Sequence, residues 1–135
     1  DIASETKLLT MEELEELHAL KTGALIEASI YSGASLGGGR QEQIDQLGIY
    51  AKKIGLAFQI KDDILNVEGD PALLGKAVGT DKIRQKNTYP YLMGLEQSKS
   101  FAEALVIRAL DAIEPFDRKA DPLRAIANYI VQRNR

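Results

Sequence analysis

The sequence predicts an all-α protein, and three observations support this prediction. Apolar residues recur at intervals of three and four over most of the 135 residues, as they do along one face of a helix. No segment shows the apolar–polar alternation of a strand bounded by turn residues. Glycine and proline gather in a few places, where they divide the helical segments from one another. We therefore expect several helices joined by short connections, without a sheet.

Composition and charge exclude several classes of protein. Of the residues, 44% are apolar and 27% are charged, and no apolar run is long enough to span a bilayer, so we expect no membrane insertion. A net charge of −3 gives no general attraction to nucleic acid. The absence of cysteine excludes a disulfide framework and a thiolate metal site, and it fits a cytoplasmic location.

The first helix is predicted to begin at a capping box. Thr10 stands where an N-cap does, and Glu13 is placed to bond back to it. One apolar stripe follows, loosened around Gly23, and it comprises Leu14, Leu17, Leu20 and Leu25. Residues 22–36 continue as a helix rich in small residues that suit close approach of another helix, namely Ala24, Ala28, Ser29, Gly33 and Ala34. Three consecutive glycines end this helix at residues 37–39.

The rest of the chain divides into further helices. Thr88 and Pro90 are typical of an N-cap and a first helical turn, and Pro115 separates two later helices. The predicted segments are a long helix over residues 41–67, an irregular stretch over 71–89, a helix from about residue 90, a helix over 98–113, and a last helix from about Asp121.

The long helix carries two adjacent aspartates within an apolar run, FQIKDDILNVEGD, over residues 58–70. Residues three and four apart share a helix face, so Gln59, Asp62, Asp63 and Asn66 are predicted to line one strip about two turns long. Such a strip can hold a magnesium ion from one side and leave its other positions to water and phosphate oxygens. The alternative is a solvated helix face. The apolar neighbours, the amide of Asn66 and the basic segment that follows favour the metal site.

Two basic segments offer places for an anion. Residues 69–90 are rich in glycine and carry Lys76, Lys82, Arg84 and Lys86, which could neutralise the aspartates or bind the outer oxygens of a phosphate. Lys21 and Thr22 beside Gly23 could also reach an anion, and the alternative there is an ordinary helix kink. His18 has no partner histidine in the sequence, which makes it a poor candidate for a metal ligand.

Four segments in this order resemble the motifs of one family, the trans-type isoprenyl diphosphate synthases or polyprenyl synthetases, and most closely those of its bacterial farnesyl diphosphate synthases. The segments are HALKTGALIEASIYSGA (18–34), GLAFQIKDDILNVEGD (55–70), GKAVGTDKIRQKNTYPYLMGLEQ (75–97) and YIVQRNR (129–135). The family's first aspartate-rich motif has no counterpart here. We therefore expect residues 1–135 to be the C-terminal part of a single domain from a chain about twice as long.

The resemblance implies an antiparallel helix bundle of the isoprenoid synthase type and a Mg2+-dependent prenyltransferase. Such an enzyme condenses an allylic diphosphate, dimethylallyl or geranyl diphosphate, with isopentenyl diphosphate. The products are farnesyl or geranylgeranyl diphosphate and pyrophosphate, and the sequence does not separate these two chain lengths. The family is usually homodimeric, so a homodimer is expected.

The resemblance also assigns roles to individual residues. It makes Asp62 a direct magnesium ligand and Asp63 an outer-shell one, with Asn66 at the edge of the metal site where the family usually has Asp. The diphosphate would be bound by Lys21, Lys76 and Lys86. The reacting carbocation and its departing proton would pass Thr22 and Gln59, which together with Lys21 form the catalytic set. The basic tail, with Arg133 and Arg135, would close over isopentenyl diphosphate.

The main alternative is a non-catalytic regulatory subunit that binds an active prenyl diphosphate synthase. Asn66 favours it mildly, whereas the intact Asp62, Asp63, Lys21 and Lys76 speak against it. A terpene cyclase fits poorly, because its second metal motif needs a hydroxyl residue at 66 and a glutamate at 70. A helical interaction domain would leave the ordered motifs unexplained.

Overall fold

A computed structural model describes residues 7–69 and 86–134, and all the regular structure within these ranges is helical. This confirms the predicted all-α class. The elements are α1 (Met11–His18), η2 (Ala19–Gly23), α2 (Ala24–Leu36), α3 (Gln41–Gly69), α5 (Tyr89–Met93), α6 (Leu95–Ala112), η4 (Arg118–Ala120) and α7 (Asp121–Gln132).

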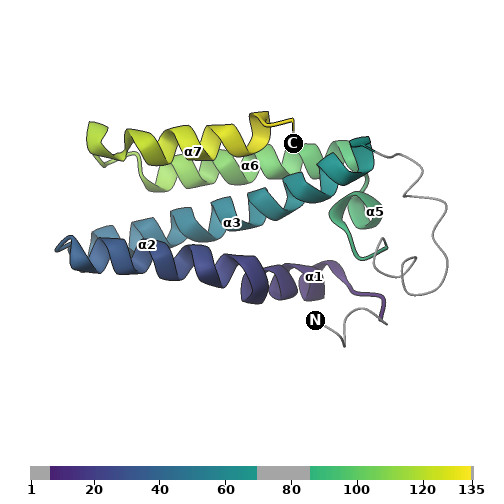
Figure 1. Cartoon of the computed structure of the whole chain (residues 1–135), viewed down its shortest axis with the longest axis horizontal. Coiled ribbons are helices and arrows are strands. Elements are labelled where there is room, and N and C mark those ends of the chain that lie inside the picture. The colour runs from purple at the N-terminus through teal and green to yellow at the C-terminus, as the bar shows by residue number, and fades with distance from the viewer. Residues whose placement is uncertain (1–6, 70–85, 135) are drawn as a thin grey trace.

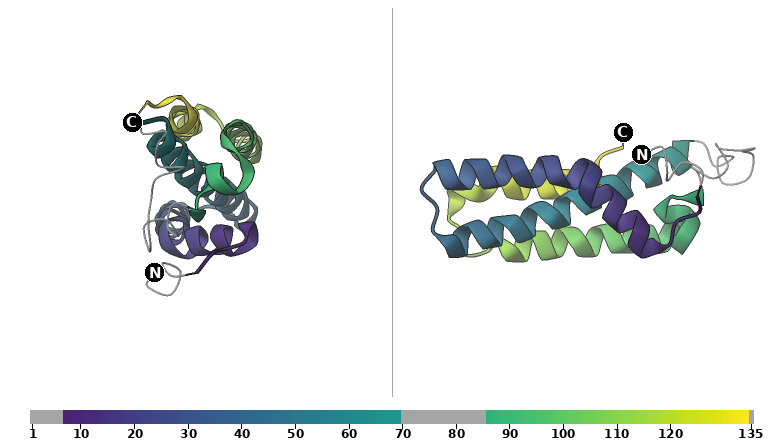
Figure 2. Two further views of the ribbon diagram at one scale, coloured as in Figure 1. Left: turned by 90° about the vertical axis from the view of Figure 1, so that its right-hand side faces the viewer. Right: turned by 90° about the horizontal axis from the view of Figure 1, so that it is seen from below.

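The longest helix, α3, runs through the middle of the molecule (Figure 1). The α6 and α7 helices lie along one side of it, and α2 lies along the other, continued by η2 and α1 (Figures 1 and 2). The pairs α2–α3, α3–α6 and α6–α7 run antiparallel. The arrangement is therefore an antiparallel helix bundle in which α3 contacts both sides.

The helix ends follow the predicted capping signals. Thr10 Oγ1 accepts a hydrogen bond from Glu13 N at 3.2 Å, and Glu13 Oε2 accepts one from Thr10 N at 2.9 Å, which completes the capping box. Thr88 Oγ1 accepts from Tyr91 N at 3.4 Å at the start of α5. The long helix extends to Gly69, two residues beyond its predicted end. These ends are set locally, because each cap satisfies backbone N–H groups that lack a partner within the helix.

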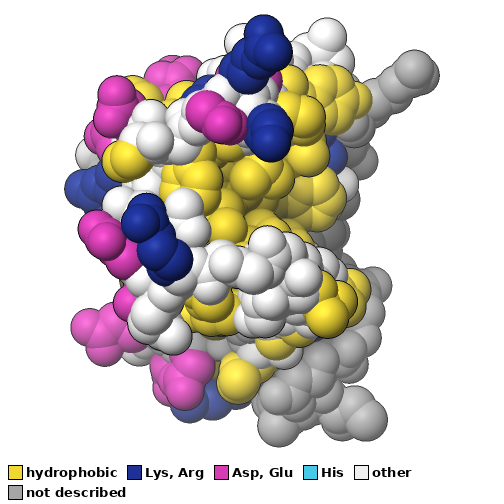
Figure 3. Space-filling view, turned by 90° about the vertical axis from the view of Figure 1, so that its left-hand side faces the viewer, with side chains coloured by type: hydrophobic (Ala, Val, Ile, Leu, Met, Phe, Trp, Pro, Cys, Tyr) yellow, Lys and Arg dark blue, Asp and Glu magenta, His cyan; other side chains and the backbone are white. Residues whose placement is uncertain are grey.

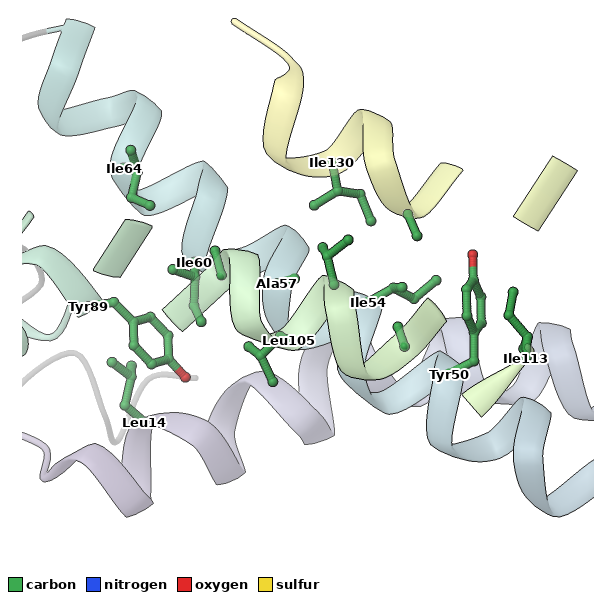
Figure 4. Packing of buried hydrophobic residues seen from close by; sticks show 14 residues of the cluster. Leu14, Tyr50, Ile54, Ala57, Ile60, Ile64, Tyr89, Leu105, Ile113 and Ile130 are labelled. Atoms are coloured by element: carbon green, nitrogen blue, oxygen red, sulfur yellow. The ribbon is translucent and has the colours of Figure 1, made fainter. Parts of the chain in front are cut away.

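The core follows one face of α3. Buried side chains recur along this helix at intervals of three and four residues, at Tyr50, Ile54, Ala57, Ile60 and Ile64. They pack against α6, α7 and α1 through Leu105, Ile113, Ile130, Leu14 and others (Figure 4). Burial of each large apolar side chain stabilises the fold by about 1.5–3 kcal/mol. The Tyr50 hydroxyl also donates to the Leu123 carbonyl at 2.6 Å, which joins α3 to α7.

The predicted single apolar stripe along residues 14–25 is wrong. Leu14 is 1% exposed, but Leu20 and Leu25 are 73% and 72% exposed. Leu20 points about 120° away from Leu14 even on a regular helix. For Leu25 the cause is η2, a π-helical segment in which Ala24 N bonds to Ala19 O, five residues back. A hydrogen bond with this spacing adds a residue to the turn and shifts the phase of every side chain that follows.

Close helix approach comes from glycines of α3 and not from the small residues predicted on α2. Ala24, Ala28, Ser29 and Gly33 are exposed, and no residue of α2 is buried. A Cβ atom added to Gly48 would lie 2.7 Å from Tyr31 Oη, and one added to Gly55 would lie 3.4 Å from Gly23 Cα. The apolar α2 helix therefore leaves much of its surface in contact with solvent.

A hollow of about 600 Å³, lined by both apolar and charged side chains, opens at the end of the bundle where α2 leads into α3 and α6 leads into α7 (Figure 3). It is lined by Leu47, Phe116 and Leu123 among others. Arg124 closes the nearby turn, with Nη2 donating to the carbonyls of Phe116 and Ile113 at 2.7 and 3.0 Å. At a helical rise of about 1.5 Å per residue, Leu47 lies about 22 Å along α3 from Asp62. The hollow is therefore separate from the aspartate pair.

Candidate active site

Asp62 and Asp63 leave α3 in different directions, because consecutive helical residues point about 100° apart. Asp62 faces the end of α7, where its Oδ1 forms an ion pair with Arg133 Nη2. The side chains of Arg133 and Asp62 are 10% and 36% exposed. Asp62 thus lies at the border between protein and solvent, beside a positive charge.

Arg133, the residue directly after α7, is held in place by α3. Its guanidinium carbon lies 4.3 Å from the centroid of the Phe58 ring, and its Nη2 donates to the Phe58 carbonyl at 3.2 Å. Its Nε is buried, with no hydrogen-bond partner among the described residues. A guanidinium over an aromatic face gains from the ring quadrupole and keeps a fixed orientation. The position of the Arg133 guanidinium beside Asp62 is therefore fixed by its contacts with Phe58.

Asp63, in contrast, points into the protein and is 7% exposed. Its Oδ2 accepts a hydrogen bond from Tyr89 N at 3.2 Å, and its Oδ1 accepts one from Gln59 Nε2 at 3.4 Å. Burial raises the pKa of Asp63 to about 6, since removal from water disfavours the charged form; the two hydrogen bonds oppose this shift, and the charge of Asp62 adds to it.

The predicted single strip of polar residues is therefore divided. Gln59 belongs with Asp63, to which its amide donates. Asn66 lies one turn beyond Asp62 and is exposed. Asp62 and Asn66 can be reached from solvent, whereas Asp63 is buried and Gln59 is half-buried.

Lys21 and Thr22 lie within the π-helical segment η2. Lys21 is exposed, Thr22 is half-buried, and the adjacent Gly23 is buried against Gly55 of α3. Gly55 precedes Gln59 by four residues, about 6 Å along the helix. In place of the ordinary helix kink that was the alternative here, the segment forms a π-helical distortion, of the kind that often occurs at functional sites.

His18 stacks on the Tyr89 ring, with centroids 5.6 Å apart and planes inclined by 28°. Neither ring nitrogen has a hydrogen-bond partner among the described residues. Burial lowers the pKa of His18 to about 4, and the nearby charge of Lys21 acts in the same direction. His18 is therefore a neutral packing residue near pH 7.

The donor set of the described residues suits one side of a magnesium site. No group of three or more His, Asp or Glu side chains that could hold a metal comes together within residues 7–69 and 86–134. Asp62 offers a carboxylate at the solvent border, and this carboxylate is already paired with the positive charge of Arg133. Asn66 offers a neutral oxygen one turn away. Magnesium is commonly held by one or two carboxylates together with waters and phosphate oxygens, so this set fits it.

Comparison with known proteins shows the family. The sequence profile described as Polyprenyl synthetase matches residues 1–125. The chain belongs to the polyprenyl synthetase family.

Named relatives of this polyprenyl synthetase chain are prenyl diphosphate synthases. It is 47% identical over 135 residues to a geranylgeranyl diphosphate synthase of Cyanophora paradoxa, covering 99% of this chain and 45% of that protein. It is 44% identical over 135 residues to a farnesyl diphosphate synthase of Micrococcus luteus, covering 100% of this chain and 46% of that protein. The chain thus spans about half the length of the curated relatives it matches.

A solved structure gives the same result for the fold. A geranyltransferase of Helicobacter pylori, complexed with magnesium and isoprenyl diphosphate, superimposes with a TM-score of 0.70 at 31% identity. The match covers 98% of this chain and 43% of the solved one.

Three further residues of this polyprenyl synthetase chain are predicted to bind diphosphate, namely Lys76, Lys86 and Arg135. Lys76 and Arg135 lie outside the described residues. Lys86 is half-buried, and its Nζ lies 5.8 Å from the centroid of the Tyr91 ring. Over the described ranges, no helix has the length and apolar character needed to cross a bilayer.

The sequence prediction missed Phe58 and Tyr89, which hold Arg133 and Asp63. Phe58 directly precedes Gln59 in the quoted motif, so its position four residues before Asp62 was a usable signal. Tyr89 had none, because its contact with Asp63 joins residues 26 positions apart.

Proposed function

We propose that the protein containing this chain is a Mg2+-dependent prenyltransferase. It condenses an allylic diphosphate, dimethylallyl or geranyl diphosphate, with isopentenyl diphosphate and releases pyrophosphate. The observation that carries the proposal is Asp62, a carboxylate of α3 at the solvent border that is held beside the Arg133 cation, in a chain of the polyprenyl synthetase family. A relative solved with magnesium and isoprenyl diphosphate supports the choice of metal and substrate class.

In this proposal Asp62 holds magnesium and Asn66 contributes a weaker, neutral oxygen. Asp63 is the outer-shell residue that the family resemblance implies. Bound magnesium neutralises negative charge on the diphosphate and makes it a better leaving group. The chain contributes the acidic side of the site, and the substrate oxygens complete it.

Lysines of this chain bind the diphosphate from the other side. Lys21, Lys76 and Lys86 are proposed to contact its outer oxygens, where each positive charge favours the charge that develops on the leaving group. The allylic carbon–oxygen bond breaks and its electron pair leaves with pyrophosphate. The double bond of isopentenyl diphosphate then attacks the carbocation. The resulting cation loses a proton to an oxygen of the pyrophosphate, and the C–H electron pair forms the new double bond.

Two polar residues and the C-terminal residues of the chain are proposed to guide the carbocation and to keep water away from it. Thr22 and Gln59 are proposed to line the path of the carbocation and of the departing proton. Arg133 and Arg135 are proposed to close over isopentenyl diphosphate and to exclude water, which would otherwise capture the carbocation. Arg133 must leave Asp62 to do so, which predicts a change of partner when substrate and metal bind.

We also propose that residues 1–135 form the C-terminal part of one synthase domain. Coverage of 45–46% of the relatives' length and the exposed apolar surface of α2 support this assignment. A homodimer in the cytoplasm and a farnesyl or geranylgeranyl product remain predictions. Relatives named as geranylgeranyl and as farnesyl synthases match about equally well, so likeness does not choose the product.

The test begins with the intact mass of the purified protein, which shows whether it exceeds the 14.8 kDa of this chain. The intact protein is then incubated with geranyl and isopentenyl diphosphates, with magnesium and with excess chelator. Formation of a longer prenyl diphosphate only with magnesium supports the proposal. No product under either condition, together with tight binding to an active synthase, would favour the regulatory subunit.

A further inference from the structure

Asp63 has both carboxylate oxygens engaged inside the protein. Oδ2 accepts from the backbone N–H of Tyr89 and Oδ1 accepts from Gln59 Nε2, at 3.2 and 3.4 Å. The side chain is 7% exposed, whereas the neighbouring Asp62 lies at the solvent border. Oxygens used in this way are turned away from the side that carries Asp62 and Asn66.

The partner of Asp63 is itself fixed. Tyr89 is fully buried, stacks on His18 of α1 and lies 6.4 Å, centroid to centroid, from Phe101 of α6. The Tyr89 side chain points toward Leu14 (Figure 4). The hydrogen bond from Tyr89 N therefore joins α3 to a residue that is already packed against α1 and α6.

The residues just before Tyr89 form a junction with the start of the described chain. Asn87 Oδ1 accepts from Leu9 N at 2.7 Å, and Asn87 Nδ2 donates to Lys7 O at 2.6 Å. Thr88 caps α5 through Tyr91 N. Residues 86–89 thus connect the segment before α1 with α3, α5 and α6, and Asp63 supplies the bond to α3.

Lys86 is the first residue of this junction, three positions before Tyr89. Its Nζ lies over the Tyr91 ring of α5, so its position depends on how α5 begins. A change at the Asp63–Tyr89 bond would move the start of α5 and with it the Lys86 ammonium. A displacement of about 1 Å in a group that positions a substrate is enough to reduce a rate substantially.

We propose that Asp63 is a positioning residue, which fixes the junction of residues 86–89 through Tyr89 N–H and so sets the place of Lys86. It makes no direct contact with metal or substrate. This inference rests on the proposed function, in which Lys86 binds the diphosphate. It divides the work of the adjacent aspartates. Asp62 serves the ligand, and Asp63 holds the element that carries a ligand-binding lysine.

The test compares Asp63→Asn, Asp63→Ala and Asp62→Asn in the intact protein. Asparagine at 63 keeps an oxygen that accepts from Tyr89 N–H, whereas alanine leaves this buried donor unpaired. The readouts are kcat, the KM for geranyl diphosphate, the magnesium concentration at half-maximal rate, and hydrogen exchange of the peptide 86–93 measured by mass spectrometry without substrate or metal.

We expect Asp63→Asn to leave exchange in this peptide and the magnesium requirement within about threefold of the wild type. Asp63→Ala should accelerate exchange in residues 86–93. It should also raise the KM for geranyl diphosphate about tenfold, because the displaced Lys86 would lose one hydrogen bond to the charged diphosphate. Asp62→Asn should raise the magnesium requirement more than about tenfold and leave exchange in this peptide unchanged.

Two results would overturn the inference. One is a magnesium requirement in Asp63→Asn raised as far as in Asp62→Asn, which would make Asp63 a metal ligand. The other is unchanged exchange in Asp63→Ala, which would show that Tyr89 is held without Asp63. If Asp63→Ala does not fold, Asp63→Asn still decides through its magnesium requirement. An unchanged magnesium requirement in Asp62→Asn would count against the proposed metal site, and the exchange data would still test the junction.

Discussion

The two sides of α3 at residues 62 and 63 are built from identical side chains and yet have opposite properties. Asp62 is paired with Arg133 at the solvent border, and its partner comes from the end of α7. Asp63 is buried, accepts hydrogen bonds from Tyr89 N and Gln59, and has a raised pKa. The difference shows that a rotation of about 100° along one helix separates a carboxylate that solvent can reach from a buried structural contact.

The energetic consequences differ in the same way. The pair of Asp62 with Arg133 can exchange one cation for another, because the carboxylate remains reachable from solvent. The contact of Asp63 with Tyr89 satisfies a buried backbone donor, and a buried donor without a partner costs about 1–3 kcal/mol. We therefore expect changes at Asp62 to affect activity and changes at Asp63 to affect the positions of other residues.

The largest expected effect is on turnover. Asp62→Ala should lower kcat by about 1000-fold, as removal of a group that stabilises developing charge does in other enzymes. The measurement is product formation from geranyl and isopentenyl diphosphates by the intact protein. Asp111→Ala, at an exposed position of α6, is the matched control and should retain full activity. Activity of Asp62→Ala equal to that of the control would end the assignment of Asp62 to the metal site.

The second effect is on stability, and it concerns Asp63. Asp63→Asn should be more stable than Asp63→Ala by about 2 kcal/mol, because only asparagine keeps an acceptor for Tyr89 N–H. The free energy of unfolding in urea measures this difference. The same pair at position 62 should differ by less than about 0.5 kcal/mol, since Asp62 is partly exposed. Equal differences at both positions would remove the contrast between the two sides.

The third effect is the pH dependence of the free energy of unfolding, and it concerns His18, which stacks on the buried Tyr89 beside Asp63. The folded protein binds a proton at His18 only below about pH 4, whereas the unfolded chain binds it below about 6.5. Between these values the unfolded state holds more protons, so the free energy of unfolding falls as the pH falls. His18→Phe keeps a stacking ring but has no group that titrates. Between pH 6.5 and 4 its free energy of unfolding should fall by about 1.5 kcal/mol less than that of the wild type, a value that allows for the partial solvent exposure of His18.

His18 is the single histidine of the sequence, so this comparison has no contribution from another imidazole. Unfolding in urea at pH 4, 5 and 6.5 gives the two curves. If the free energies of unfolding of the two proteins change in parallel with pH, His18 is protonated equally in the folded and unfolded states. The His18 ring stacked on Tyr89 would then be open to water.

The smallest expected effect concerns the cation on the exposed side. Arg133→Gln should raise the affinity of the intact protein for magnesium about threefold, because the competing charge at Asp62 is removed and a partly exposed ion pair is worth little. Isothermal titration with magnesium measures it. Arg108→Gln, on the exposed surface of α6, should bind magnesium as the wild type does. Weaker binding in Arg133→Gln would mean that Arg133 orients Asp62 for the metal.

Much of the fold could be predicted from the sequence because its signals are local. The capping box at Thr10 and Glu13, the N-cap at Thr88 and the break at Pro115 set helix ends with residues a few positions apart. The phase of α1 relative to α2 could not be predicted, since the π-helical segment at Ala19–Gly23 has no clear sequence signal beyond Gly23. Its effect, the exposure of Leu25, followed from one additional residue in a turn.

For the candidate site, the sequence by itself determined the residue types and their spacing along α3. It placed Gln59, Asp62, Asp63 and Asn66 near one another on a helix, because helical geometry is the same in every protein. Only the tertiary structure decided which aspartate is buried. That choice depends on Arg133 and Tyr89, which lie 71 and 26 residues away in the chain from Asp62 and Asp63. Contacts over such separations form only when the helices pack, so the pattern within one helix does not contain them.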